Sequence, residues 1–345
     1  MTPDKGPGAV PGARSDARKE IRLDGGAGGG RGAGADAGTG ASARWTVAGL
    51  LVIAVIWGGT FPVVKDLVET VSPYSVVAAR FAVAFALLGA VAFLRRRRWR
   101  PGLLRAGIVL GLVLWGGYFT QTYGLQFTTA SKAGFITALN VVFVAVMAAV
   151  LSRRKTPLLT WAGVGVAALG LALLTVDWSE RFYLQTGDAW VILCAVLFAL
   201  HIVLVDRLAP EYDPVLMTWV QVGVVAAVAS GAAFVFDGGI GGLAGPRHWW
   251  QLMYLAALAT AGAVLLQVYL QKFAAPARVG LVLSLEPVFA ALFSWAFLGE
   301  TLPLAGWIGG ALVLAGVVLA ELDPQPKTGA PAAGAAVPGA GEARP

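Results

Sequence analysis

Long runs of apolar residues, separated by short polar connectors, dominate this chain of 345 residues. A run of about 20 apolar residues is long enough to cross a lipid bilayer as a helix. We predict ten transmembrane helices, at residues 45–64, 74–94, 104–123, 132–152, 158–176, 188–206, 214–236, 249–271, 277–298 and 304–321. The runs lack the alternation of apolar and polar positions that membrane β-strands show. The pattern therefore predicts an all-α membrane protein.

The composition agrees with this prediction, because 57% of the residues are hydrophobic and only 13% are charged. A soluble protein of this size needs far more polar surface than such a chain can supply. The two ends differ from the rest. Residues 1–44 and 322–345 are rich in Gly, Ala and Pro, and we predict that they are disordered cytoplasmic tails. The single cysteine, Cys194, excludes an intramolecular disulfide.

The net charge of +7 comes from lysines and arginines that crowd into the connectors and the N-terminal tail. This distribution suits the headgroups of anionic membrane lipids better than nucleic acid. With the N-terminus inside the cell, twelve cations fall on the cytoplasmic side: Arg95, Arg96, Arg97, Arg98, Arg100, Arg105, Arg153, Arg154, Lys155, Arg207, Lys272 and Arg278. At most four fall outside: Lys65, Lys132, Arg181 and Arg247. Because short cytoplasmic loops carry the excess of Lys and Arg, we predict a multi-pass protein of the cell inner (plasma) membrane with both termini cytoplasmic.

The two halves of the chain repeat one another. A segment that begins at Gln121 matches, without gaps, the segment that begins 146 positions later at Gln267. The matched pairs of less common residue types are Gln121 with Gln267, Tyr123 with Tyr269, Pro157 with Pro303 and Trp161 with Trp307. We place the repeats at 45–176 and 188–321. Each holds five helices, an odd number, so the second copy is predicted to be inverted, which is a structural basis of alternating access.

Four stretches of this repeat are similar to a known family: "WGGTFPVVKDL", "ARF", "QTYGLQFTTASKAGFITALNVVFV" and "SLEPVFAALFSWAFLGETLPLAGWIGGALVLAGVVL". Over residues 46–321 the chain resembles the EamA-type permeases of the drug/metabolite transporter superfamily. The resemblance implies a ten-helix fold of two inverted five-helix EamA repeats. It also implies a central cavity between the first, third, fourth, sixth, eighth and ninth helices, and transport of a small organic solute, often outward.

Glu286 and Pro287 lie in the middle of the ninth predicted helix. An ionised carboxylate is costly at that depth, so we expect Glu286 to exchange a proton during transport or to act as a protonated hydrogen-bonding group between helices. The first reading makes Glu286 the candidate for the coupling proton. Pro287 removes a backbone donor, which predicts a helix kink, either beside the cavity or as plain packing.

Further polar and aromatic side chains inside the predicted helices complete the candidate cavity: Trp57, Thr60, Gln121, Asn140, His201 and Gln267. Gln121 and Gln267 hold matching places in the two repeats. Their amides both donate and accept hydrogen bonds, which suits an amino acid or another polar solute; bonds between helices are the alternative. Asn140 matches Glu286. His201 is a candidate for titration near neutral pH or a structural hydrogen-bonding group.

Three cations in or beside the predicted helices are interpreted as structural. Arg80, in the second predicted helix, is expected to extend outward to the membrane surface or to pair with Asp66. Lys132 and Arg278 begin the fourth and ninth predicted helices and are expected to bind lipid headgroups, or alternatively to attract an anion at each gate. This interpretation leaves no cation at mid-membrane, which weighs against an organic-anion carrier.

The predicted function is a secondary active transporter that exports a small organic metabolite, amino acid-like or amphipathic, by alternating access, with a proton as the candidate coupling ion. The alternatives are an organic-anion or sugar-phosphate exchanger of the same fold, and a membrane sensor or scaffold. An enzyme is not expected, because the sequence has no H-E-x-x-H motif and its two histidines, His201 and His248, are far apart. No cofactor or metal site is predicted. The oligomeric state, monomer or homodimer, stays open.

Overall fold

The structure is a computed structural model that describes residues 33–94, 99–151, 157–175, 186–242, 245–298 and 304–322. Every regular element within these residues is helical. The chain divides into two compact units, residues 1–40 and 41–345. Of the first unit, the structure describes only residues 33–40, which form the beginning of helix α1. The fold described below is that of the second unit.

Eight helical segments of the described residues are long and apolar enough to cross a membrane: Arg44–Val68, Pro73–Leu94, Leu103–Gly124, Lys132–Leu151, Thr186–Leu208, Pro214–Asp237, His248–Leu270 and Pro276–Phe293. Two shorter apolar helices, Leu158–Leu173 and Leu304–Ala320, lie where the fifth and tenth helices were predicted. The prediction of an all-helical membrane protein is confirmed. That all ten segments cross the membrane stays a prediction.

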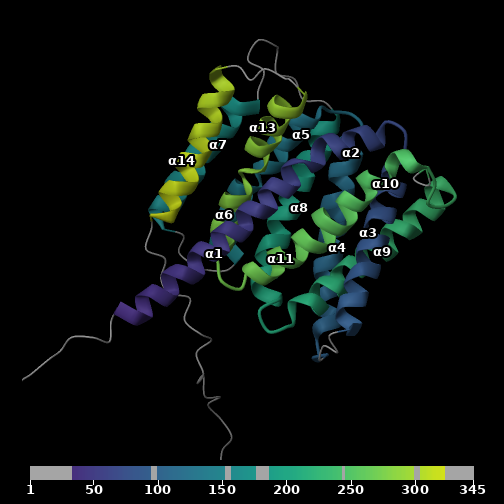
Figure 1. The fold of residues 1–345 in the computed structure, drawn as a ribbon, viewed down its shortest axis with the longest axis horizontal. Coiled ribbons are helices and arrows are strands. Elements are labelled where there is room, and N and C mark those ends of the chain that lie inside the picture. Colours follow the sequence, from purple (N-terminus) through teal and green to yellow (C-terminus); the bar gives the residue numbers. More distant parts are fainter. Residues whose placement is uncertain are drawn as a thin grey trace, which may run out of the picture. The chain divides into compact units, whose positions relative to one another are not determined.

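Four of the ten predicted helices are divided into shorter pieces (Figure 1). The first consists of α1 (Ala33–Gly58) and α2 (Thr60–Val68), and the fourth of α5 (Ala130–Ala138) and α6 (Asn140–Leu151). The eighth consists of α10 (Pro246–Met253), the π-helix η1 (Tyr254–Gly262) and α11 (Ala263–Leu270), and the ninth of α12 (Pro276–Leu283) and α13 (Glu286–Leu298). The undivided helices are α3 (Pro73–Leu94), α4 (Leu103–Gly124), α7 (Leu158–Thr175), α8 (Thr186–Leu208), α9 (Pro214–Asp237) and α14 (Leu304–Glu321).

Helix α1 begins at Ala33, within the segment 1–44 that the sequence predicts to be a disordered tail. The alanines of this stretch favour a helix even where the glycines between them do not. The part of the helix that is apolar enough for a membrane begins at Arg44, next to the predicted start at residue 45. The remainder of the two predicted tails, residues 1–32 and 323–345, lies outside the described residues.

Corresponding helices of the two predicted repeats pack on each other: α3 lies against α9, and α7 lies against α14 (Figure 1). The backbones of α7 and α14 come very close. A Cβ atom added to Gly163 would lie 2.5 Å from the carbonyl oxygen of Gly316, and one added to Gly170 would lie 2.6 Å from that of Gly309. Small residues allow this approach between membrane helices. Because Gly163 matches Gly309 and Gly170 matches Gly316 in the repeat, the two contacts are reciprocal.

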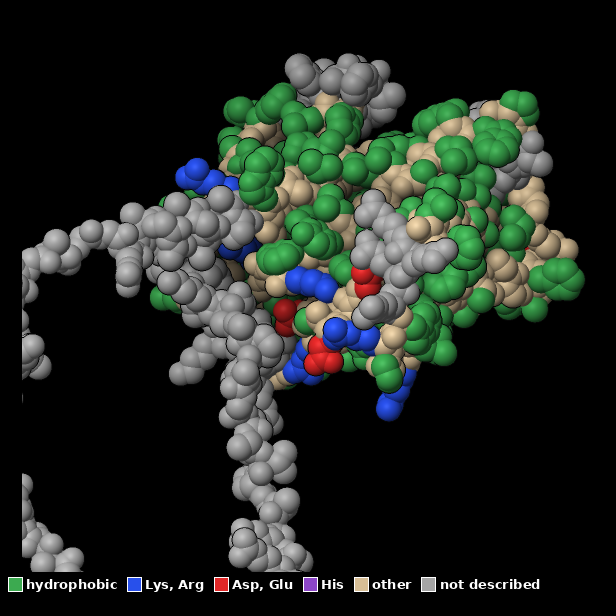
Figure 2. Space-filling model, turned by 60° about the horizontal axis from the view of Figure 1, so that its bottom comes forward, with side chains coloured by type: hydrophobic (Ala, Val, Ile, Leu, Met, Phe, Trp, Pro, Cys, Tyr) green, Lys and Arg blue, Asp and Glu red, His purple; other side chains and the backbone are tan. Residues whose placement is uncertain are grey.

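The outside of the bundle is largely apolar. Figure 2 shows hydrophobic side chains over most of the visible face, while most of the visible Lys, Arg, Asp and Glu side chains lie in its lower part and a few basic ones lie at its left. Large exposed apolar side chains come from helices of both halves, among them Val52, Leu112, Leu169, Phe234 and Leu314. Such surfaces are costly in water and suited to contact with lipid tails.

One cysteine on each side tests the predicted orientation. Thr70, between α2 and α3, and Glu211, between α8 and α9, are both exposed. With the buried Cys194 replaced by Ala, we expect Thr70→Cys to react with a membrane-impermeant maleimide in intact cells. Glu211→Cys should react only after the membrane has been permeabilised. Labelling of Glu211→Cys alone in intact cells would reverse the orientation inferred from the Lys and Arg bias.

Candidate functional site

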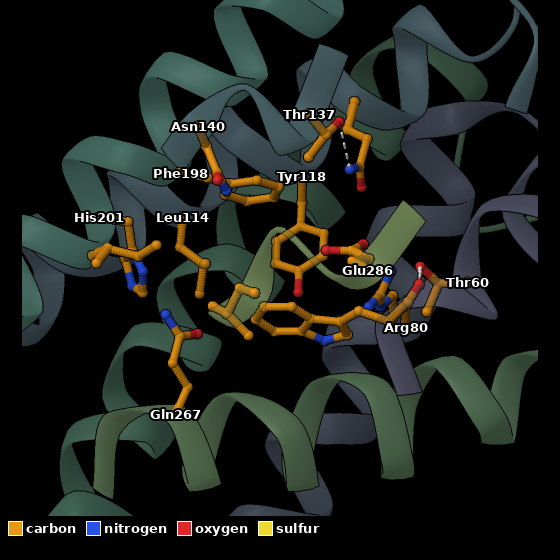
Figure 3. A pocket seen from close by; sticks show the side chains of 14 residues that line it. Thr60, Arg80, Leu114, Tyr118, Thr137, Asn140, Phe198, His201, Gln267 and Glu286 are labelled. Atoms are coloured by element: carbon orange, nitrogen blue, oxygen red, sulfur yellow. Dashed lines mark hydrogen bonds between the residues drawn. The ribbon is translucent and has the colours of Figure 1, made fainter. Parts of the chain in front are cut away.

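Side chains from both predicted repeats surround one cavity inside the bundle (Figure 3). The lining consists of Trp57, Thr60, Arg80, Leu114, Tyr118, Gln121, Thr137, Asn140, Phe198, His201, Ile202, Gln267, Leu283 and Glu286. The cavity is narrow, with a volume of about 40 Å³, which is room for roughly three water molecules. A larger solute therefore needs the surrounding helices to move apart.

All seven residues that the sequence singles out as cavity candidates lie in this lining: Trp57, Thr60, Gln121, Asn140, His201, Gln267 and Glu286. They belong to the six helices that the family resemblance places around a cavity. Figure 3 shows Thr60 and Glu286 toward one side of the cavity and His201 and Gln267 toward the other. Residues that are far apart in the sequence are thus brought together between the two halves.

Asn140 and Glu286 occupy corresponding places at breaks in two helices. Asn140 is the first residue of α6, directly after the break at Leu139. Glu286 is the first residue of α13, after the break at Ser284 and Leu285. Pro287 follows in the first turn of α13, where a missing backbone N–H leaves no helix bond unmade. The helix predicted to kink at Pro287 is thus divided beside the cavity into α12 and α13, and the backbone nitrogen of Leu285 still donates to the carbonyl oxygen of Val282 at 3.2 Å.

The start of α13 is held against the end of α1 by a glycine. A Cβ atom on Gly58 would lie 2.8 Å from the carbonyl oxygen of Glu286 and 3.0 Å from the backbone nitrogen of Ala290. Contacts that close do not leave room for a side chain. Gly58 therefore allows the first and ninth predicted helices to touch through their backbones beside the cavity.

The π-helix η1 lies behind the cavity and is tied to the end of α1. The indole nitrogen of Trp57 donates to the carbonyl oxygen of Ala259 at 2.8 Å. The Tyr254 hydroxyl donates to the carbonyl oxygen of Ile56. Wider π turns are rare and occur mostly at functional sites. Here the π-helix provides backbone acceptors to side chains of the cavity wall.

Arg80 lies in the cavity wall and does not extend outward as the sequence analysis expected. Its side chain is 3% exposed. Its Nε donates to the Thr260 hydroxyl at 2.6 Å, and its guanidinium lies 4.6 Å from the centre of the Tyr118 ring. Asp66, the expected partner, accepts a hydrogen bond from Gln251 at 2.7 Å instead. The reason is the packing of α3 against η1, which turns Arg80 toward the interior of the bundle.

The amide side chains of the cavity differ in how fully they are paired. Gln121 donates to the Thr137 hydroxyl over a long 3.4 Å. The side-chain oxygen of Asn140 is buried and has no partner in the described part of the protein. His201 is 2% exposed, with its Nε2 at 2.8 Å from the side-chain oxygen of Gln221. The weakly paired amides are the groups best able to exchange protein contacts for contacts with a solute.

Helical spacing identifies several wall residues that the sequence analysis missed. Leu114 and Tyr118 lie seven and three positions before Gln121 on the same face of α4, and both line the cavity. Phe198 lies three positions before His201 on α8 and lines it as well. Counting one helical turn from each predicted polar residue would have found them. For Arg80, the signal was its match to Gln221, another polar residue inside a predicted helix, at the offset of 141 positions that aligns the early parts of the repeats.

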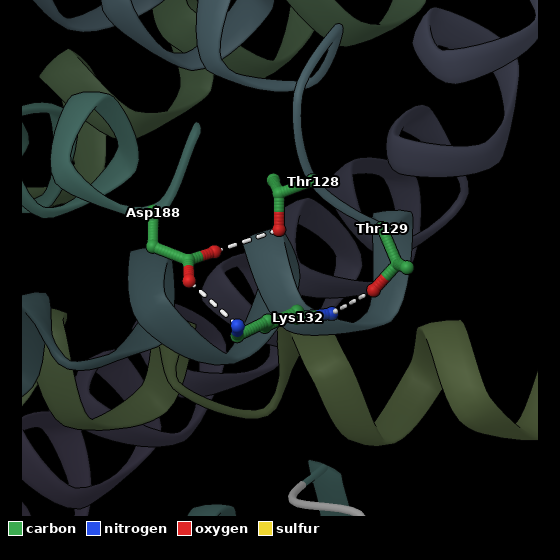
Figure 4. A network of polar contacts seen from close by, with 4 residues as sticks. All are labelled: Thr128, Thr129, Lys132 and Asp188. Carbon is green, nitrogen blue, oxygen red and sulfur yellow. Dashed lines mark hydrogen bonds and ion pairs between the residues drawn. The ribbon is translucent and has the colours of Figure 1, made fainter. Parts of the chain in front are cut away.

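Away from the cavity, an ion pair joins the two predicted repeats (Figure 4). Lys132, on α5, lies 2.6 Å from the carboxylate of Asp188, in the first turn of α8. The same carboxylate, which is fully buried, accepts a hydrogen bond from the Thr128 hydroxyl at 2.7 Å. Thr129 caps α5 by accepting from the backbone nitrogen of Lys132 at 3.2 Å. Lys132 thus pairs inside the protein, where the sequence analysis expected a headgroup anchor.

Basic side chains at another junction bind backbone oxygens between α8 and α9. Lys272 donates to the carbonyl oxygen of Tyr212 at 2.7 Å, and Arg100 donates to that of Glu211 at 2.9 Å. Burial lowers the pKa of Lys272, and the nearby carboxylate of Asp213 partly opposes this effect. The half-buried Lys272 and the exposed Arg100 thus both bind the connector that joins α8 to α9.

Comparison with known proteins agrees with this geometry. The model of a family described as "EamA-like transporter family" matches residues 44–176 and 185–322. The chain belongs to this family. The two matched segments correspond to the two predicted repeats, and membership identifies this EamA protein as a multi-pass membrane transporter.

Relatives of this EamA protein carry transporter names. An "Uncharacterized transporter" of Archaeoglobus fulgidus is 30% identical over 278 residues, which is 79% of this chain and 85% of the relative. The "Uncharacterized inner membrane transporter YedA" of Escherichia coli K12 is 24% identical, over 79% of this chain and 89% of the relative. A WAT1-related chloroplast protein of Arabidopsis thaliana is 25% identical, over 81% of this chain and 70% of the relative. A crystal structure with 17% identity matches 81% of this chain and 97% of its own with a TM-score of 0.69, which shows the same fold.

Proposed function

We propose that this EamA protein is a secondary active transporter that exports a small organic solute by alternating access. The observation that carries the proposal is the cavity itself. Polar side chains from both repeats converge on it, and two broken helices begin there with Asn140 and Glu286. Broken helices that meet at a cavity between repeats are the usual construction of solute sites in secondary transporters.

The contacts between the repeats support an inverted arrangement. A two-fold axis relating the halves would bring matching helices together in pairs. It would also make each contact occur twice with the partners exchanged. The pairing of α3 with α9, and the reciprocal contacts of Gly163 with Gly316 and Gly170 with Gly309, have this form. Five crossings per repeat would place that axis in the membrane plane. The halves could then exchange conformations to open the cavity to either side.

Proton coupling through Glu286 is the second element of the proposal. Within the described lining of the cavity, Glu286 is the sole carboxyl group. The lining also contains Arg80, which lies on the same side of the cavity as Glu286 (Figure 3). A carboxyl group that gains and loses a proton as the cavity opens to the two sides would couple solute movement to the proton gradient.

The glutamine pair provides the test of the solute site. Gln121→Ala and Gln267→Ala should each reduce uptake of the transported solute in proteoliposomes by about tenfold, since one hydrogen bond to a polar solute is worth about 1–1.5 kcal/mol. The melting temperature should remain within a few degrees of the wild-type value. The matched control is Gln271→Ala, because Gln271 bonds to the carbonyl oxygen of Ile202 and does not line the cavity.

The solute itself can be found by comparing metabolites in the medium of cells that lack or overproduce the protein. A cavity role requires that the same metabolites respond to Gln121→Ala and Gln267→Ala but not to Gln271→Ala. Uniform loss of stability in both cavity variants, with unchanged apparent affinity in the protein that survives, would assign the glutamines to helix packing.

A further inference from the structure

Arg80 places a positive charge inside the cavity, and the proposed transport mechanism does not yet use it. It lies on α3, the one helix of the cavity wall that the family resemblance does not place there. Figure 3 shows it on the same side of the cavity as Glu286 and Thr60. Arginine stays protonated in proteins, and a charge inside a membrane bundle is costly unless something compensates it. A group that compensates the positive charge of Arg80 is therefore expected near its guanidinium.

The contacts of Arg80 within the described protein orient its guanidinium without neutralising it. Nε donates to the Thr260 hydroxyl at 2.6 Å, and Nη2 donates to the carbonyl oxygen of Ala259 over a long 3.5 Å. The Thr260 hydroxyl is itself fixed, because it donates to the carbonyl oxygen of Leu255 at 2.7 Å. The ring of Tyr118 lies under the guanidinium at 4.6 Å. All of these groups are neutral, and among the described residues none of the carboxylates forms an ion pair with Arg80.

We infer that Arg80 is the anion-recognition residue of the cavity and that the transported solute carries a carboxylate or a similar small anionic group. The inference rests on the proposed function and specifies its substrate class. A planar guanidinium pairs with a carboxylate through two parallel hydrogen bonds, which gives both strength and orientation. The sequence argument against an organic anion was the lack of a mid-membrane cation. The position of Arg80 in the cavity removes that argument.

The remainder of the wall fits the rest of such a molecule. The amides of Gln121, Gln267 and Asn140 offer donors and acceptors to polar groups. Trp57 and Phe198 offer aromatic faces to a short apolar part.

The test uses probes that differ in whether they carry a carboxylate. Purified full-length protein in proteoliposomes is given four compounds built on one side chain: valine, N-acetylvaline, valinamide and N-acetylvalinamide. The first two carry a carboxylate and the last two do not. The set is repeated on alanine and phenylalanine to vary size. We expect uptake above that of empty liposomes for carboxylate-bearing members only. Arg80→Gln should reduce that uptake tenfold or more, the fold-change expected for loss of a charge-assisted hydrogen bond.

Two further variants separate recognition from folding. Arg105→Gln removes an exposed arginine from the first turn of α4 and should leave uptake unchanged. Arg80→Lys keeps the charge but loses the planar fork, so KM should rise while the maximal rate and the melting temperature stay close to wild type. If Arg80→Gln does not fold, Arg80→Lys carries the test alone, and an unchanged KM in it contradicts the inference.

A double variant addresses the alternative that Arg80 only balances the charge of Glu286. On that alternative, Arg80→Gln/Glu286→Gln should recover the carboxylate uptake that Arg80→Gln loses. We expect no recovery. Uptake of valinamide or N-acetylvalinamide at the rate of valine would overturn anion recognition while leaving the transport function standing. Failure of the folded wild-type protein to move any probe would count against both.

Discussion

Glu286→Gln is expected to abolish solute accumulation driven by a pH gradient while leaving downhill exchange of the same solute intact. Glutamine keeps the shape and hydrogen-bonding capacity of the side chain but cannot gain or lose a proton. Glu286 is the candidate for carrying the coupling proton, since the described lining of the cavity contains no second carboxyl group. Gly58 of α1 packs directly against the backbone of Glu286 at the start of α13.

The size of the expected effect follows from the gradient. A pH difference of one unit is worth about 1.4 kcal/mol per proton, so coupling one proton to one solute supports up to about tenfold accumulation. The Gln variant should reach equal concentrations on both sides. The coupling can also be measured in the opposite direction, with a pH-sensitive dye trapped inside the proteoliposomes. A solute gradient imposed on the wild-type protein should then drive protons across the membrane and change the signal of the dye. The variant should show no such proton movement.

Two companion variants make this result interpretable. Glu286→Asp keeps a titratable group and should retain accumulation, at a reduced rate. Glu69→Gln removes an exposed carboxylate at the end of α2 and should behave as wild type. Accumulation against a gradient by Glu286→Gln would show that the proton uses another route and would assign Glu286 to solute contact or helix packing.

The pattern of apolar runs predicted the location of the helices but not their interruptions. Apolar length alone determines where a chain can cross a membrane, which is why the predicted positions agree with the helical segments. The break at Leu139 is not marked by proline or glycine in its own sequence. It depends on tertiary packing around the cavity, as does the π-helix of Tyr254–Gly262. Local residue preferences do not report such packing.

The candidate site was found because polar residues are conspicuous in apolar helices and because the repeat pairs them. Gln121 with Gln267 and Asn140 with Glu286 could be identified in this way. Arg80 was not, because a long basic side chain near a helix end usually reaches the membrane surface. Its actual direction is set by Thr260 and Tyr118, which are distant in sequence. Contacts of that range become visible only once the fold is known.

Gly170→Ala is expected to produce a large loss of stability, although it adds only one methyl group to α7. The new Cβ would lie 2.6 Å from the carbonyl oxygen of Gly309 and 2.7 Å from the backbone nitrogen of Val313. Backbone atoms cannot rotate away as a flexible side chain can, so α7 and α14 must separate. Apolar burial does not hold membrane helices together, and close packing has to do so. Overpacking of this kind costs about 1–3 kcal/mol, which exceeds the gain of about 0.5–1 kcal/mol from replacing glycine in a helix.

Gly165→Ala is the matched control within the same helix. A Cβ atom there meets no atom within 4 Å, so only the favourable change in helix preference remains. Melting of the purified protein, followed by tryptophan fluorescence, should show a drop of several degrees for Gly170→Ala and no drop for Gly165→Ala. The reciprocal substitution Gly316→Ala should resemble Gly170→Ala, since its Cβ would lie 2.5 Å from the carbonyl oxygen of Gly163. Equal melting temperatures for Gly170→Ala and Gly165→Ala would mean that α7 and α14 do not pack through their glycine faces. The reciprocal contacts would then no longer support a two-fold relation between the repeats.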